Sequence, residues 1–129
     1  MADNERLICA SHELKDSAHG IRFDLPELGE RTSGFVVRYN GKAYAYVNEC
    51  AHLSVELDWN EGDFFDLSRH YLICATHGAQ YQPETGYCVL GPCKGRSLLA
   101  VEVIERDNEI LINLDSLKPY PLKKVPKHV

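Results

Sequence analysis

Two short stretches of this 129-residue chain decide its fold: N-E-C-A-H-L at residues 48–53 and C-A-T-H-G at residues 74–78. Each stretch contributes one cysteine and one histidine, in the pattern C-x-H followed after 21 residues by C-x-x-H. The four side chains are those of Cys50, His52, Cys74 and His77. Two thiolates and two imidazoles in short loops are what a metal or an iron–sulfur centre requires.

The distribution of these ligands favours a two-iron cluster over zinc. Two cysteines and two histidines can also close a structural zinc site, which usually pairs cysteine with cysteine and histidine with histidine along the chain. Here each loop supplies one of each. This mixed arrangement suits a [2Fe–2S] cluster in which two thiolates hold one iron and two imidazoles hold the other. A structural zinc domain remains the alternative.

The residues after the second histidine resemble the second cluster loop of Rieske-type proteins. They are Gly78, the aromatic Tyr81, the turn Thr85-Gly86 and the pair Gly91-Pro92. Asn48, shortly before the first cysteine, also fits this family. Weaker similarity runs from about Arg6 to Asn113, which is nearly the whole chain.

The resemblance implies that Cys50 and Cys74 bind the inner iron, and that His52 and His77 bind the outer, solvent-facing iron. With two ferric ions, two sulfides and two thiolates, the oxidised site carries no net charge and accepts an electron more readily than a site with four thiolates. Histidine ligation accordingly raises the potential to roughly −150 to +300 mV, against about −400 mV for plant-type ferredoxins. Such a cluster has no open coordination position, so we expect the chain to carry electrons and not to be an enzyme by itself.

The resemblance also assigns four residues to the surroundings of the cluster: Gly78, Tyr81, Gly91 and Pro92. Glycine permits close backbone approach and N–H contacts to sulfur. Proline removes a donor and stiffens the covering loop. In high-potential members of the family, the tyrosine that corresponds to Tyr81 donates a hydrogen bond to the sulfur of the first cysteine.

One departure from the family indicates the subgroup. Rieske proteins of respiratory complexes carry an extra cysteine in each cluster loop, and these two form a disulfide. The corresponding positions here are Ser54 and Thr76, so this disulfide cannot form. The resemblance is therefore closest to soluble Rieske ferredoxins and to the Rieske domains of oxygenases, although a chain of this length has no room for an oxygenase's separate catalytic domain.

Two functions fit this resemblance. The first is a free ferredoxin that takes electrons from a flavin- and NAD(P)H-dependent reductase and passes them to an oxygenase or another terminal enzyme. The second is a small electron-transfer subunit of a larger reductase, similar to the small subunit of assimilatory nitrite reductase. The sequence does not distinguish them.

Composition and length predict one domain over residues 1–117, followed by a mobile, basic, proline-rich tail over residues 118–129. Residues 1–115 hold all 19 acidic residues and 10 of the 14 basic residues, and an acidic body argues against nucleic-acid binding. No apolar run approaches the length of a membrane span, and no signal peptide is apparent. We therefore expect a cytoplasmic monomer with redox proteins as partners.

The periodicity of the chain is mostly that of strands, which predicts an all-β fold of small antiparallel sheets with the cluster between two loops at one tip. The dipeptide Asn40-Gly41 is the strongest hairpin signal. The predicted strands are Arg6–Ala10, Gly20–Asp24, Gly34–Tyr39, Lys42–Asn48, His70–Cys74, Leu98–Glu105 and Glu109–Leu114. One helical turn is predicted within residues 11–17.

The remaining cysteines and a cluster of acids have simple interpretations. Cys9, Cys88 and Cys93 are expected to be reduced thiols, because no secretory signal is apparent. The acidic residues between the two ligand loops form either a solvated face or a docking site for a basic partner. They are Glu56, Asp58, Glu61, Asp63 and Asp66.

The residues beside the ligands predict a reduction potential below zero, in the lower part of the Rieske range. Ala79 stands where high-potential members have a serine that donates to a cluster sulfur, so Ala79→Ser should raise the potential and Tyr81→Phe should lower it. A hydrogen bond to a charged group contributes about 1.5–3 kcal/mol, and about 1.4 kcal/mol corresponds to about 59 mV for one electron. Shifts of several tens of millivolts are expected by potentiometric titration. A wild-type potential above about +200 mV would contradict the ferredoxin-like assignment, since it lies near the top of the family range.

Overall fold

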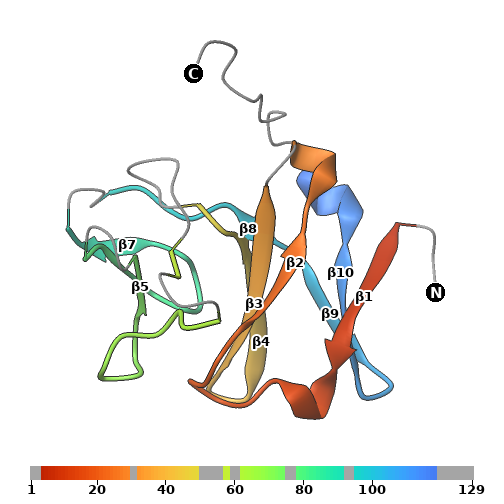
Figure 1. The fold of residues 1–129 in the computed structure, drawn as a ribbon, viewed down its shortest axis with the longest axis horizontal. Helices are drawn as coiled ribbons and strands as arrows, with labels where there is room; N and C mark the ends of the chain where they lie inside the picture. Colours follow the sequence, from red (N-terminus) through yellow and green to blue (C-terminus); the bar gives the residue numbers. More distant parts are fainter. Residues whose placement is uncertain are drawn as a thin grey trace.

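The computed structural model describes residues 4–29, 32–49, 57–58, 62–74, 78–91 and 95–118. Over these residues the chain forms ten short strands and three turns of 3-10 helix, and no α-helix. The strands assemble into three small antiparallel sheets (Figure 1). The predicted all-β fold is confirmed. No helix in the described part of the chain is long and apolar enough to span a bilayer.

Two of the sheets form the base of the molecule. The first contains β1 (Glu5–Ala10), β10 (Glu109–Asn113) and β9 (Val103–Arg106), in that order. The second contains β2 (Ile21–Asp24), β3 (Ser33–Tyr39), β4 (Lys42–Val47) and β8 (Ala100–Val101). The 3-10 turns are Ser11–Glu13, Pro26–Leu28 and Leu114–Leu117. The first of these confirms the helical turn predicted within residues 11–17.

A third sheet lies to one side of this base (Figure 1) and contains the second ligand loop. Its strands are β5 (Leu72–Ile73), β6 (Gln80–Tyr81) and β7 (Cys88–Leu90). The prediction of a strand over residues 70–74 is correct only at its centre. β6 and β7 were not predicted, because strands of two or three residues are too short to show an alternating pattern.

The β3–β4 hairpin confirms the strongest local signal in the sequence. Asn40 and Gly41 adopt φ angles of +52° and +82°, which are the left-handed values that a two-residue hairpin turn needs. The two strands pair in register from Tyr39–Lys42 to Gly34–Val47. The far end of β4 therefore leads directly into the segment that contains the first ligands.

The predicted strand over residues 98–105 is divided between two sheets. β8 pairs with β4, and β9 pairs with β10. Between them, the Glu102 N–H donates to Ser116 Oγ at 3.0 Å, and the Glu102 carbonyl accepts from the Asn113 N–H at 2.9 Å. The chain changes sheet at this residue, which an apolar pattern alone does not reveal.

Two apolar clusters make up the core. One contains residues from the described ends of both predicted ligand loops and includes Phe35, Leu57, Cys74 and Tyr81. Within it, the rings of Phe35 and Phe64 stack with their centroids 4.0 Å apart. The other cluster lies in the base and includes Cys9, Leu25, Val36 and Ile110. The first cluster joins the third sheet to the base, because Phe35 belongs to β3 and Tyr81 to β6.

Two leucines, one buried and one exposed, test how much this junction contributes to the free energy of unfolding. Leu72 in β5 is fully buried, whereas Leu67, five residues earlier, is fully exposed. We expect Leu72→Ala to lower the free energy of unfolding by about 2–5 kcal/mol, because it leaves a cavity. Leu67→Ala should change it by less than about 0.5 kcal/mol. Urea unfolding of the two variants beside wild type measures both values, and equal losses would contradict the described packing.

Candidate metal centre

The second ligand loop begins at Cys74, directly after β5. This side chain is completely buried. The Cys74 N–H donates to the Ala79 carbonyl at 2.9 Å, and the Gly78 N–H donates to the Cys74 carbonyl at 2.8 Å. These two bonds close a tight loop between β5 and β6. Gly78 ends the loop with a φ of +73°, so it has the left-handed conformation that glycine adopts without strain.

The first ligand loop is described at its two ends. Asn48 is buried where β4 ends, and Leu57 is buried where the chain returns. The Leu57 N–H donates to the Asn48 side-chain carbonyl at 2.9 Å, which joins these two ends. Leu57 and Cys74 belong to the same apolar cluster, so the end of the first loop and the start of the second are anchored in one core.

Four of the eight predicted site residues lie outside the described residues. They are Cys50, His52, His77 and Pro92. The other four are Cys74, Gly78, Tyr81 and Gly91, and Tyr81 is fully buried beside the Cys74 loop. Cys93 also lies outside, while Cys88 is buried as expected and its Sγ donates to the Leu90 carbonyl at 3.4 Å.

Gly91 brings the end of β7 against the second ligand loop. It adopts a φ of +107°, and a Cβ atom there would lie 2.9 Å from the Ala79 Cα. No side chain fits at this distance, so the two backbones are in direct contact. The covering role that the sequence predicts for residues 91–92 stays a prediction, and Pro92 lies outside the described residues.

The described residues fit a [2Fe–2S] cluster. A buried cysteine at the start of a tight loop can supply a thiolate whose charge is balanced by iron. The neighbours of Cys74 in its cluster, among them Leu57, Ala79 and Tyr81, are apolar or aromatic and would exclude water from the inner side of such a site. The remaining ligands predicted by the sequence lie in the segments that extend directly from these anchored positions.

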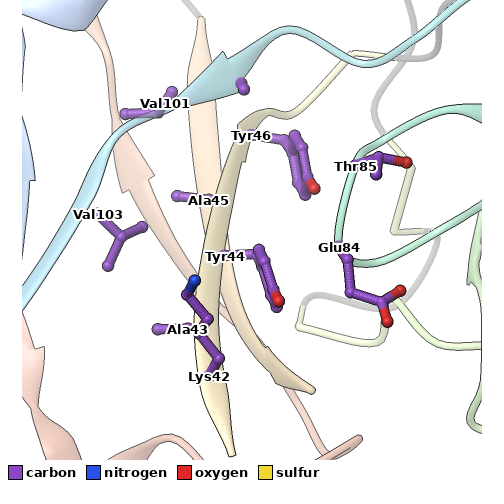
Figure 2. A pocket seen from close by; sticks show the side chains of 10 residues that line it. Lys42, Ala43, Tyr44, Ala45, Tyr46, Glu84, Thr85, Val101 and Val103 are labelled. Atoms are coloured by element: carbon purple, nitrogen blue, oxygen red, sulfur yellow. The ribbon is translucent and has the colours of Figure 1, made fainter. Parts of the chain in front are cut away.

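Tyr46 attaches the third sheet to the base. Its hydroxyl donates to the Pro83 carbonyl at 2.6 Å, and the Leu98 N–H donates to the Gly86 carbonyl at 2.9 Å. Burial raises the pKa of Tyr46, so the hydroxyl keeps its proton and remains a donor across the neutral range. Figure 2 shows the rings of Tyr44 and Tyr46 extending from β4 toward Glu84 and Thr85, across a cavity of about 250 Å³.

The structure corrects the interpretation of the acidic segment. The Asp58 side chain is completely buried, with 0% of its surface exposed, so it is not available for docking. Asp63 is exposed, and Asp66 is half-buried and accepts from Ser68 Oγ at 2.7 Å. Glu56 and Glu61 lie outside the described residues. Sequence reasoning missed the role of Asp58, because nothing local distinguishes a buried acid within an acidic run.

Two glycines that flank residues 92–94 test the covering contact. Gly91 and Gly95 both have left-handed φ angles, +107° and +95°, but a Cβ at Gly95 would meet no described atom within 4 Å. Both Gly→Ala variants should lose about 1–3 kcal/mol from backbone strain. Gly91→Ala should lose about 1–3 kcal/mol more from overpacking. Thermal unfolding measures the difference, and equal losses would show that no close contact exists at Gly91.

Comparisons with known proteins show the family and the fold of this chain. The family model described as Rieske [2Fe-2S] domain matches residues 4–121. No curated protein sequence matches the chain. Among solved structures, the chain is similar to the ferredoxin of carbazole 1,9a-dioxygenase from Nocardioides aromaticivorans IC177, with a TM-score of 0.67 and 24% identity over 85% of this chain and 97% of that one.

It is also similar to a chain in the complex of reduced oxygenase and oxidized ferredoxin in carbazole 1,9a-dioxygenase. That match has a TM-score of 0.70 and 19% identity over 88% of this chain and 95% of that chain. A chain of the reduced complex between oxygenase and ferredoxin gives a TM-score of 0.70 and 20% identity over 87% of this chain but 28% of the other. Likeness at these identities shows a shared fold. Because the family model spans nearly all of the sequence, the chain belongs to the Rieske [2Fe–2S] domain family, and its cofactor is a [2Fe–2S] cluster.

Proposed function

We propose that this protein is a one-electron carrier whose cluster is held by Cys50, His52, Cys74 and His77. The observation that carries the proposal is Cys74, which is fully buried at the start of a closed loop within a Rieske domain. When bound, the cluster supplies a site that accepts and releases a single electron.

The residues of the chain determine how that site behaves. Two thiolates from the cysteines offset the positive charge of the cluster, and the buried position of Cys74 keeps water away from its sulfur. The backbone contact between Gly91 and Ala79 covers the second loop. The buried residues Tyr81 and Leu57 anchor the described ends of the loops, which suits an electron carrier because little rearrangement is then expected with each change of charge.

An oxygenase is the proposed acceptor. The chain covers nearly the full length of a ferredoxin of carbazole 1,9a-dioxygenase, and that system includes complexes between ferredoxin and oxygenase. We infer that a flavin- and NAD(P)H-dependent reductase supplies the electrons, and that the protein acts as a cytoplasmic monomer. The alternative, a bound small subunit of a larger reductase, predicts stable copurification with a large partner, whereas a free carrier purifies alone.

Loss of either cysteine ligand should prevent cluster assembly. Protein purified without oxygen should be brown and contain about two iron and two sulfide per chain, and its reduced form should give an electron paramagnetic resonance signal with a low average g value. Cys50→Ser and Cys74→Ser should contain little iron, because an inner-iron ligand is lost. Cys9→Ala is the matched control, since Cys9 is also buried but belongs to the other apolar cluster.

The same preparations test electron transfer. Wild-type protein should be reduced by one electron per chain and reoxidised by a purified Rieske-type oxygenase, with recovery of the original spectrum. Freshly made wild-type protein with stoichiometric zinc and no sulfide would exclude the proposal. A fully loaded Cys74→Ser variant would show that the ligands have been wrongly assigned.

A further inference from the structure

Asp58 is a buried carboxylate with a hydrogen-bond donor at each oxygen. Its Oδ1 accepts from Asn48 Nδ2 at 3.0 Å, and its Oδ2 accepts from the Gly62 N–H at 3.0 Å. The Arg22 guanidinium reaches from β2 to within 3.7 Å of Oδ2 and provides the opposite charge. The Asp58 side chain has no exposed surface, while that of Arg22 is 26% exposed. Burying a charge in this way is costly unless it is paired and hydrogen-bonded, as it is here.

Asn48 uses its remaining groups to join the two ends of the first ligand loop. Its side-chain carbonyl accepts from the Leu57 N–H at 2.9 Å. Its own N–H donates to the Ser33 carbonyl at 2.8 Å, which fixes it to β3. Asn48 therefore bonds to the chain before the loop and to the chain after it. Residues 49–56, with Cys50 and His52 among them, lie between these fixed ends.

We propose that Asn48 and Asp58 form a clamp that positions Cys50 and His52 for the cluster. This inference rests on the proposed function, because it assigns the clamp to two of the proposed ligands. A loop with fixed ends has fewer conformations to lose when its ligands close on the metal. Asp58 is required because it orients the Asn48 amide: Asn48 Nδ2 donates to Asp58 Oδ1, which leaves the amide oxygen directed at the Leu57 N–H.

Exchanging the side chains of Asn48 and Asp58 distinguishes the positioning role of their hydrogen bonds from a contribution to packing alone. In Asn48→Asp, a carboxylate oxygen faces the Asp58 carboxylate. In Asp58→Asn, a single amide oxygen must serve two donors, the Asn48 amide and the Gly62 N–H. In the double variant, the carboxylate at position 48 accepts from Leu57 and from the amide at position 58, whose oxygen accepts from Gly62. The double variant thus restores all three hydrogen bonds and the net charge, although Arg22 then faces an amide oxygen at position 58 instead of a carboxylate.

The single variants should hold about fivefold less iron and sulfide than wild type, or less still, because each leaves a buried polar group unsatisfied. Their remaining loaded fraction should show altered g values in electron paramagnetic resonance. Peptide-level hydrogen exchange should show faster exchange around Leu57. The double variant should regain most of the wild-type iron content and protection, together with wild-type g values, because its hydrogen bonds are restored and only the Arg22 ion pair is altered. Asp63→Asn is the control, because it removes an exposed charge from the same segment and should leave all three readouts unchanged.

The clamp is overturned if the single variants load fully with unchanged g values, or if the double variant recovers no better than either single. It is also overturned if iron loss only follows the unfolded fraction, measured by circular dichroism, while the loaded fraction keeps wild-type g values. Failure of the proposed function looks different, since the wild-type protein itself would then lack iron and sulfide.

Discussion

An iron–sulfur cluster whose ligands come from two loops requires that two segments distant in the sequence are held next to each other where the loops begin and end. In this protein one apolar core cluster includes both Leu57, from the end of the first predicted ligand loop, and Cys74, from the start of the second, which meets the requirement. Phe35 of β3 and Tyr81 of β6 belong to the same cluster, so the packing that brings the loops together also joins the third sheet to the base. The site and the junction between the sheets are therefore one structural unit.

Polar contacts complement this apolar junction at its edges. The Tyr46 hydroxyl holds the turn at Pro83, and the Gly86 carbonyl accepts from Leu98 where the chain re-enters the base. On the other side, the Asn48–Asp58 pair is anchored to β3 and faces Arg22. Apolar packing supplies most of the stabilisation but has little directionality. The buried hydrogen bonds fix the orientation of the groups that they join. A loop that carries metal ligands depends on such orientation more than a surface turn does.

The parts of this structure that the sequence predicts are those that depend on neighbouring residues. Asn40-Gly41 identifies its hairpin because the turn geometry itself requires those residue types. The spacing of cysteine and histidine predicts the family and its [2Fe–2S] cofactor, which the family model confirms, because the cluster chemistry restricts the types of ligand. The change of sheet at Glu102, the two-residue strands and the burial of Asp58 depend on partners far away in the sequence. The amide of Asn48 and the guanidinium of Arg22 decide that Asp58 is internal, and neither is visible from the acidic run around it.

The pairing of β1 with β10 affects the order of events during synthesis. Glu5 lies opposite Asn113, so the first of the described strands cannot pair until the last of them has been made. The ligand loops are translated well before that sheet closes. Contacts between residues far apart in the sequence slow folding. The chain must lose conformational entropy to bring its ends together before these contacts can stabilise the fold. The apolar cluster around Cys74 draws all its members from residues 35–98, so its contacts do not depend on the pairing of β1 with β10, and the core beside the site can form while the base is still open.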